Sequence, residues 1–278
     1  MACSGQTPRI KLIMTDIDNT IMPAGEHQVS ARTVAAFHAA LDAGIVIGPA
    51  SGRGRVQVAP FFRGDEACFA TAVATNGLEV YCQGEKIGEY RLPVAYLEQT
   101  LEVVRSIPGA GLLWFDGTQP YLVAGDRDVL EGIVPAYARA CIATDELPAE
   151  PILKANAFID GDAAATEAFV ARLNAEVDGL DFDIPMLGYA NIMPAGRNKG
   201  SAIRTLCDHM GIGLDEVAVF GDAGNDLTMF KVAGHPVAVA NATPEAAAAA
   251  RWHIGACKDD AVAEAIEALA AGEWPFTA

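Results

Sequence analysis

Short apolar runs rich in β-branched residues alternate with amphipathic segments, and this alternation constrains the fold of the chain most strongly. The run at 10–15 ends abruptly in an aspartate and is typical of a buried strand. The segment 30–44 has apolar residues at helical spacing between a serine N-cap and a glycine stop, and it leads into a second apolar run at 45–47. Alternating strands and helices predict an α/β fold with a doubly wound parallel sheet.

The pattern changes between residues 84 and 187, where the chain carries its own aromatic residues. We expect helices at 94–107, 129–140 and 163–177, a hairpin at 112–123 around Asp116-Gly117, and strands at 155–160 and 181–184. About 100 residues are enough for a domain. The sequence therefore predicts a core formed by residues 1–83 and 188–278, interrupted by a smaller α+β domain at 84–187.

The parallel pattern surrounds this insertion. Before it, a strand is expected at 71–75, closed by the turn Asn76-Gly77. After it, we expect a helix at 199–210, a strand at 217–220, a short helix after Asn225, a strand at 236–240, an alanine-rich helix after Thr243-Pro244, and a helix at 261–271.

The charge balance excludes two classes of partner. The 278 residues include 19 Lys and Arg against 36 Asp and Glu, which gives a formal net charge of −17. Such an excess repels nucleic acid and anionic membrane surfaces. No apolar run approaches the roughly 20 residues of a membrane-spanning helix, and the short polar start lacks the features of a signal peptide. We expect a cytoplasmic protein and leave its oligomeric state open.

Cysteine and histidine spacing indicates neither a disulfide scaffold nor a zinc knuckle. None of the cysteines forms a Cys-x-x-Cys pair, and the five histidines show no metal-binding spacing. We expect reduced, mostly buried thiols at Cys3, Cys68, Cys82, Cys141, Cys207 and Cys257.

Four aspartates lie where two of the predicted strands end. Asp16 and Asp18 follow the first strand, and Asp222 and Asp226 follow the strand at 217–220. In an open parallel sheet, ligands bind at the carboxyl ends of the strands. Carboxylate oxygens on short loops suit a hard divalent cation, although each loop alone is equally typical of a solvated acidic turn.

Hydroxyl and cationic groups occupy two further positions of this kind. Ser51, Gly52 and Arg53 follow the second strand, where a hydroxyl and free N–H groups can hold an anion. Lys199 opens a predicted helix, where its charge opposes the helix dipole unless an anion is nearby. Each feature alone is more simply a helix cap or a surface cation. Acid, hydroxyl, lysine and acid in that order together predict one catalytic site.

These four elements resemble the motifs of the haloacid dehalogenase superfamily of phosphohydrolases. The family pattern of Asp-x-Asp-x-Thr, Ser or Thr, Lys, and Gly-Asp-x-x-x-Asp is matched by Asp16, Asp18, Thr20, Ser51, Lys199, Asp222 and Asp226. The insertion after the third strand and the Ser-Gly-Arg triplet are similar to the Cof-type branch, with its Rossmann-like core and α/β cap. One departure is Asn19, where glycine is commoner.

The resemblance implies hydrolysis of a phosphate monoester through an aspartyl-phosphate. Asp16 is the implied nucleophile and Asp18 the implied general acid and base. The implied metal is Mg²⁺, with Asp16, Asp18, Asp222 and Asp226 at its site. The implied phosphate-binding residues are Thr20, Ser51, Gly52, Lys199 and Asn225, and Arg53 and Asn76 are the candidate contacts to the rest of the substrate.

Three functions fit this pattern. The leading one is a magnesium-dependent phosphatase acting on a small phosphorylated metabolite, with a sugar phosphate as the expected class. The second is a phosphomutase of the phosphomannomutase type, in which the phosphoryl group returns to the substrate. The third is a non-enzymatic phospho-receiver, which needs only about 120 residues and no inserted domain.

Overall fold

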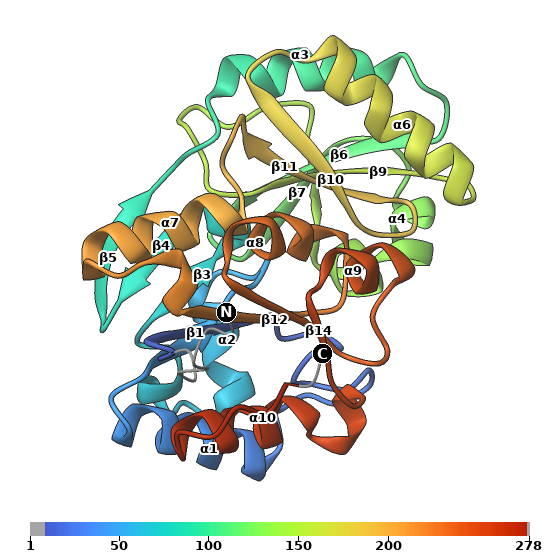
Figure 1. The fold of residues 1–278 in the computed structure, drawn as a ribbon. Coiled ribbons are helices and arrows are strands. Elements are labelled where there is room, and N and C mark those ends of the chain that lie inside the picture. Colours follow the sequence, from blue (N-terminus) through green and yellow to red (C-terminus); the bar gives the residue numbers. More distant parts are fainter. Residues whose placement is uncertain (1–8, 277–278) are drawn as a thin grey trace, which may run out of the picture. The chain divides into compact units, whose positions relative to one another are not determined.

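The computed structural model describes residues 9–276. The chain divides into two units, one formed by the residues up to Glu89 and from Asn198 onward, and the other by Tyr90–Arg197. The fold class is the predicted one, because the first unit is a parallel α/β core and the second is a smaller α+β unit inserted within it (Figure 1).

The core sheet has five parallel strands in the order β14-β13-β12-β1-β2. Their bounds are Trp252–His253, His235–Ala238, Val217–Gly221, Leu12–Thr15 and Val46–Pro49. The central strand β1 pairs on both sides, with Leu12 opposite Val217 on β12 and Val46 on β2. The loops that follow β1, β2 and β12 therefore emerge side by side at one edge of the sheet.

Helices cover both faces of this sheet (Figure 1). One face carries α1 (Ala31–Asp42) and α10 (Ala261–Ala270), and the other carries α7 (Lys199–Met210), α8 (Leu227–Val232) and α9 (Pro244–Ala249). Alternate side chains of β1 enter the two apolar cores, so that Ile13 packs toward Phe37 of α1, whereas Leu12 and Met14 pack toward Ile203 of α7. The sheet is thus buried on both sides, as expected for a parallel sheet.

Helix α7 begins at Lys199 because the residue before it is a strong N-cap. Asn198 Oδ1 accepts a hydrogen bond from Ser201 N at 2.9 Å, and Ser201 Oγ accepts one from Asn198 N at 3.0 Å. This reciprocal capping box satisfies two backbone donors that would otherwise lack partners. It fixes Lys199 at the first turn of the helix.

Most of the remaining elements of the core unit lie between β2 and Tyr90 in the sequence. A three-stranded sheet is formed by β3 (Ala72–Ala74), β4 (Glu79–Cys82) and β5 (Glu85–Glu89). The short helices are α2 (Arg55–Val58), η1 (Ala59–Phe62), η2 (Glu66–Phe69), η3 (Thr75–Gly77), η4 (Leu214–Glu216), η5 (Gly224–Asp226) and η6 (Cys257–Asp259). An isolated bridge between Ala50 and Val73 places β3 alongside the end of β2.

The inserted unit is built on a six-stranded sheet of order β10-β11-β9-β6-β7-β8, antiparallel except for the pair β7 and β8. The strands are β6 (Ala110–Asp116), β7 (Gln119–Ala124), β8 (Ile142–Ala143), β9 (Ala155–Ile159), β10 (Leu180–Met186) and β11 (Tyr189–Pro194). Helices α3 (Val94–Arg105) and α6 (Ala163–Glu176) pack on one face (Figure 1), and α4 (Arg127–Ile133) and α5 (Pro135–Ala140) pack on the other. The predicted hairpin at 112–123 is confirmed as β6 and β7.

Two expectations about the inserted unit differ from the structure. The single helix expected at 129–140 is interrupted, because Pro135 lacks an N–H and displaces Val134 from helical backbone angles. The unit also spans Tyr90–Arg197 and not 84–187. Strand β5 pairs with β4 and so stays with the core, whereas β11 pairs with β9 and β10 and so belongs to the insertion.

The cysteines behave as expected in the described part of the chain. Cys68, Cys82, Cys141, Cys207 and Cys257 are free and buried, and Cys3 lies outside the described residues. Within residues 9–276, no helix has both the length and the apolar character needed to cross a membrane.

Helices α7 and α8 pack so closely that only a glycine fits at position 200, and a glycine in α4 provides a control. A Cβ at Gly200 in α7 would lie 2.2 Å from the carbonyl oxygen of Thr228 in α8, whereas a Cβ at Gly132 in α4 would meet nothing within 4 Å. Gly200→Ala should destabilise the protein by about 1–3 kcal/mol through overpacking. Gly132→Ala should stabilise it by up to about 1 kcal/mol through helix propensity. Urea unfolding of both variants checks the prediction, and equal shifts would contradict it.

Candidate active site

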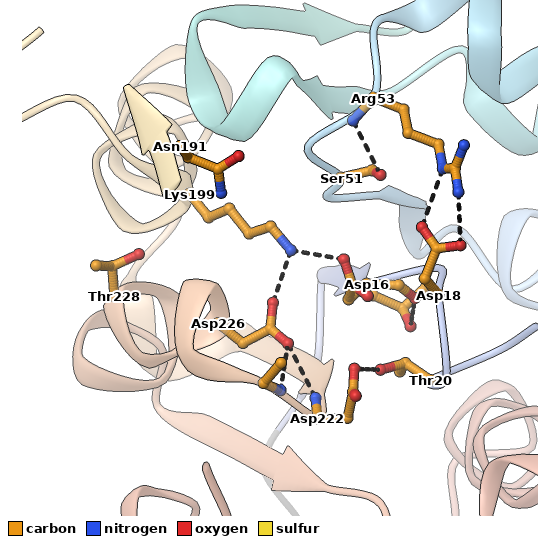
Figure 2. Close-up of polar contacts among 12 residues, drawn as sticks. Asp16, Asp18, Thr20, Ser51, Arg53, Asn191, Lys199, Asp222, Asp226 and Thr228 are labelled. Carbon is orange, nitrogen blue, oxygen red and sulfur yellow. Dashed lines mark hydrogen bonds and ion pairs between the residues drawn. The ribbon is translucent and has the colours of Figure 1, made fainter. Parts of the chain in front are cut away.

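Three aspartates from two loops meet at the carboxyl end of the central strands (Figure 2). Carboxylate oxygens of Asp16, Asp222 and Asp226 lie within 4.8 Å of one another, and all three residues are buried. Asp16 N donates to Phe220 O at 2.9 Å, which extends the pairing of β1 with β12 beyond the last strand residue. The adjacency of these two strands therefore brings together carboxylates that are far apart in the sequence.

Lys199 supplies the positive charge at the centre of this group. Its Nζ lies 2.6 Å from Asp16 Oδ1 and 2.7 Å from Asp226 Oδ1 (Figure 2), and its side chain is fully buried. Burial alone would lower the pKa of Lys199, but the two carboxylates raise the pKa above its ordinary value. The site therefore holds a permanent cation in a strongly acidic chain.

The carboxylates carry more negative charge than Lys199 can compensate. Burial raises the pKa of Asp16 to about 8; Lys199 opposes this shift, whereas Asp226 and Asp222 add to it. Burial, followed by repulsion from Asp226, raises the pKa of Asp222 to about 6. A divalent cation bound among these oxygens would stabilise their ionised forms.

The two carboxylates of the 222–226 loop have different partners. Asp226 Oδ2 accepts hydrogen bonds from the backbone N of Asp222 at 2.9 Å and of Ala223 at 3.2 Å, while Oδ1 receives Lys199. Among residues 9–276, the one side chain that donates to Asp222 is Thr20, whose Oγ1 lies 2.8 Å from Asp222 Oδ1. Asp226 thus orders the loop and the lysine, and Asp222 retains an oxygen for another ligand. Thr20, expected among the phosphate-binding residues, is buried in this contact.

Asp18 and Arg53 face each other on the more exposed side of the same site (Figure 2). Arg53 Nε donates to Asp18 Oδ2 at 3.0 Å and Arg53 Nη2 donates to Asp18 Oδ1 at 2.9 Å. Both side chains are half-exposed. The bidentate geometry fixes the plane of the Asp18 carboxylate. Arg53, expected to contact substrate, is here a partner of the expected acid and base.

The segment Ser51–Arg53, here called the hydroxyl arm, follows the end of β2. Ala50 N donates to Thr15 O at 2.7 Å, which places Ser51 beside the end of β1. Ser51 is buried, and its Oγ accepts from Arg53 N at 3.2 Å. A Cβ at Gly52 would lie 3.1 Å from Asn76 Nδ2, so the Asn76 carboxamide lies against the Gly52 backbone.

The remaining predicted position, Asn225, lies in η5 between the two aspartates of the 222–226 loop and is partly buried. The structure therefore joins Asp16, Thr20, Lys199, Asp222 and Asp226 by direct contacts, joins Asp18 to Arg53, and places Ser51, Gly52 and Asn76 on the neighbouring strand end.

Asn241 is a supporting residue that the sequence analysis did not identify. Its Nδ2 donates to Asn19 O and its Oδ1 accepts from Cys257 N, both at 2.8 Å. Asn19 has a left-handed backbone with φ of 60°, a conformation that asparagine tolerates better than most residues. This conformation explains why asparagine can replace the commoner glycine. The position of Asn241 after strand β13 was the available signal.

A second group of possible metal ligands, His38, Asp65 and Cys68, lies elsewhere in the core unit. His38 Nε2 and Asp65 Oδ2 already form an ion pair at 2.7 Å. Burial, with a smaller contribution from Asp65, raises the pKa of the Cys68 thiol to about 12. This group is accounted for by the ion pair and by packing of the thiol in the core.

Comparison with known proteins agrees with this geometry. The sequence profile of the haloacid dehalogenase-like hydrolases matches residues 13–266. The chain belongs to this family. The 5-amino-6-(5-phospho-D-ribitylamino)uracil phosphatase YbjI of Escherichia coli (strain K12) is 25% identical over 275 residues, which cover 96% of this chain and 98% of the relative. A phosphoglycolate phosphatase of Pyrobaculum neutrophilum is 26% identical, with 94% and 96% covered.

Solved structures show the same fold. SMU.1108c from Streptococcus mutans UA159 has a TM-score of 0.84 at 21% identity and covers 94% of this chain and 99% of its own. The HAD subclass IIB sugar phosphatase BT4131 has a TM-score of 0.76 at 20% identity, with 92% and 98% covered. The enzyme class expected from the sequence, a phosphatase of this family, is supported by the family match and by the names of the relatives.

The crowding of carboxylates predicts that the metal-free protein is stabilised by loss of Asp16. Unfolded aspartate ionises near 3.8, but native Asp16 only near 8, so between these values the native state holds a proton that the unfolded state has lost. Stability therefore falls as the pH rises through this range. Asp16→Asn removes the penalty and should raise the free energy of unfolding by about 1 kcal/mol or more at about pH 8.

The gain should shrink as the pH falls toward about 4 and disappear below it, where both states are protonated. Urea unfolding with a chelator present measures the gain. The control is Asp116→Asn at the exposed end of β6, which should change stability little. A variant less stable than the wild type at the higher pH would show that the bond to Lys199 outweighs the crowding.

Proposed function

We propose that this hydrolase is a magnesium-dependent phosphatase that acts on a small phosphorylated metabolite, with a sugar phosphate as the expected class. The observation that carries the proposal is the buried Lys199 bridging Asp16 and Asp226, beside Asp222. A nucleophilic carboxylate, a fixed cation and a cluster of oxygen ligands are the components that phosphoryl transfer requires, because that chemistry depends on positioning and charge stabilisation.

The donor set fits a hard divalent cation. Every ligand is an oxygen, and both Asp16 and Asp222 have an oxygen that no described side chain uses. Burial, with repulsion between the carboxylates as a smaller cause, raises the pKa values of these two carboxyls, and a bound cation would oppose both effects. Asp16, Asp222 and the backbone carbonyl of Asp18 would hold Mg²⁺, which supplies charge stabilisation for the phosphoryl oxygens when bound. Asp226 would support the site without binding the metal directly, because its two oxygens already accept hydrogen bonds from Lys199 and from the loop backbone.

Asp16 is the proposed nucleophile. Lys199 donates to its Oδ1, and Oδ2 is the oxygen proposed to attack phosphorus, so the contact of Asp16 with the metal would be through Oδ1. The bond from phosphorus to the ester oxygen breaks, an aspartyl-phosphate forms on Asp16, and Asp18 gives a proton to the departing oxygen. Asp18 then takes a proton from water, and that water attacks phosphorus to release phosphate and restore Asp16.

The phosphoryl oxygens need donors around them during both steps. Lys199 Nζ, Ser51 Oγ, the Gly52 amide and Asn225 are the proposed donors. Arg53 orients the Asp18 carboxylate through its bidentate contact. The substrate is proposed to be a small molecule in the cytoplasm, because the net charge of −17 opposes binding to nucleic acid or a membrane surface.

A phosphomutase is the second candidate, because the same aspartyl-phosphate could return its phosphoryl group to a substrate. Release of inorganic phosphate as the main product separates the two. A phospho-receiver needs no inserted unit, so the separately folded unit Tyr90–Arg197 makes this function less compatible with the structure.

A screen of phosphate esters with Mg²⁺ tests the proposal. The curated relatives are named for different esters, so sugar phosphates, nucleotides, phosphoglycolate and phosphorylated cofactors are compared by phosphate release. We expect the highest kcat/KM within the sugar phosphates and loss of turnover when the metal is chelated. Turnover that persists in chelator would contradict the metal requirement, and transfer of phosphate between substrates without release would favour the mutase.

Substitution of the two leading aspartates tests their roles. Asp16→Asn should abolish measurable turnover, because the carboxamide is not a nucleophile. Asp18→Asn should lower kcat by about 10²–10⁴-fold, the usual contribution of a general acid and base. Asp116→Asn serves as the matched control and should retain wild-type rates. An Asp16→Asn variant with undiminished turnover would exclude the proposed mechanism.

A further inference from the structure

Three consecutive residues of the core unit adopt left-handed backbone angles. The φ values are 51° at Thr75, 55° at Asn76 and 98° at Gly77. A β-branched residue such as Thr75 is rarely found there, because its Cβ crowds the backbone. Strain of this kind persists only where surrounding contacts fix it. The turn Thr75–Gly77 immediately follows β3, and one residue, Leu78, separates it from β4.

The turn is bonded directly to the hydroxyl arm. Asn76 N donates to Ser51 O at 2.9 Å and Thr75 N donates to Arg53 O at 3.0 Å. Ser51 N in turn donates to Val73 O at 2.8 Å. Both sides of the Ser51 peptide are therefore held by the segment 73–76. The left-handed angles allow two successive N–H groups of the turn to reach this arm.

The same turn also contacts the start of α7, where Asn198 and Lys199 form what is here called the lysine arm. A Cβ at Gly77 would lie 2.3 Å from the carbonyl oxygen of Asn198 and 3.2 Å from the backbone N of Lys199. The backbone of Gly77 thus packs directly on the peptide that opens α7, and no larger residue fits. Since Asn198 is the capped N-terminus of α7, this contact sets the position from which Lys199 extends.

The strained residue is anchored from its other side. Thr75 Oγ1 donates to Glu79 Oε2 at 3.3 Å, and Glu79 Oε1 accepts from Tyr81 at 2.8 Å and from Lys86 at 2.9 Å. Glu79 is buried, and these donors satisfy both of its oxygens. The bonds connect the turn to the three-stranded sheet.

We propose that the turn Thr75–Gly77 is a positioning element that fixes the separation of the Ser51 and Lys199 arms. This inference rests on the proposed function, in which both arms bind the phosphoryl group. The turn holds the first arm by hydrogen bonds and the second by close packing, and Glu79 keeps Thr75 in its strained conformation. The width of the phosphate pocket is thereby set by a residue without a side chain, Gly77.

Gly77→Ala tests this role against a glycine with the same backbone conformation. Gly84, in the turn between β4 and β5, has φ of 91°, but a Cβ there meets nothing within 4 Å. Both variants carry the left-handed strain, and only Gly77→Ala pushes against Asn198. Calorimetry with inorganic phosphate in the presence of Mg²⁺ measures the pocket, and phosphate release from the best ester measures kcat.

We expect Gly77→Ala to weaken phosphate binding at least about 10-fold and to lower kcat by about 10²-fold, as for a misplacement of about 1 Å. Half-saturating Mg²⁺ should change less than about two-fold, because Asp222 is held by Thr20 and not by the turn. Gly84→Ala should match the wild type in every measurement. A folded Gly77→Ala variant with wild-type phosphate affinity and kcat would overturn the proposal.

Substitutions at Thr75 provide the second test if Gly77→Ala does not fold. Thr75→Ser keeps the hydroxyl bond to Glu79, whereas Thr75→Val keeps the shape and loses the bond. Phosphate affinity should be near wild type in Thr75→Ser and several-fold weaker in Thr75→Val, and equal affinities would overturn the proposal.

A wild-type chain that binds phosphate but hydrolyses no ester would instead overturn only the proposed function, and one that does not bind phosphate would overturn both.

Discussion

The bridge from Lys199 to Asp16 and Asp226 is the interaction on which the rest of the site depends. A fully buried ammonium is unstable without nearby negative charge, and two buried carboxylates repel each other without a cation between them. Lys199 therefore requires a nearby carboxylate, and it offsets part of the repulsion between Asp16 and Asp226. The pairing of β1 with β12 brings Asp16 close to Asp226, and the start of α7 at Lys199 places the ammonium group between them.

A metal bound beside the bridge would resolve the conflict between an acidic chain and an anionic substrate. The net charge of −17 is a property of the whole molecule, whereas a substrate responds to the field at the site. Three buried carboxyls there face one lysine, and burial followed by their mutual repulsion raises the pKa values of Asp16 and Asp222. Metal binding would reverse that excess, so phosphate affinity and metal occupancy are expected to rise together.

The strand ends and the helix start at Lys199 could be predicted because periodicity and caps are local signals. The strands β4 and β5 could not, since polar residues such as Glu79 and Lys86 take part in contacts that only the folded chain creates. Pro135 indicates a break in the helix, but the apolar spacing around it predicted one continuous helix at 129–140. The pairing of Asp18 with Arg53 depends on side-chain direction, which residue spacing alone does not determine.

The pairing of β1 with β12 has a consequence for synthesis on the ribosome. Leu12 finds its partner Val217 only after most of the chain has been made, and Lys199 emerges only shortly before. Until then, the apolar strand β1 lacks half of its neighbours and Asp16 lacks its cation. Such long-range pairing is slow and leaves apolar surface exposed. The inserted unit, whose sheet pairs only within Tyr90–Arg197, can fold first, and enzymatic competence comes last.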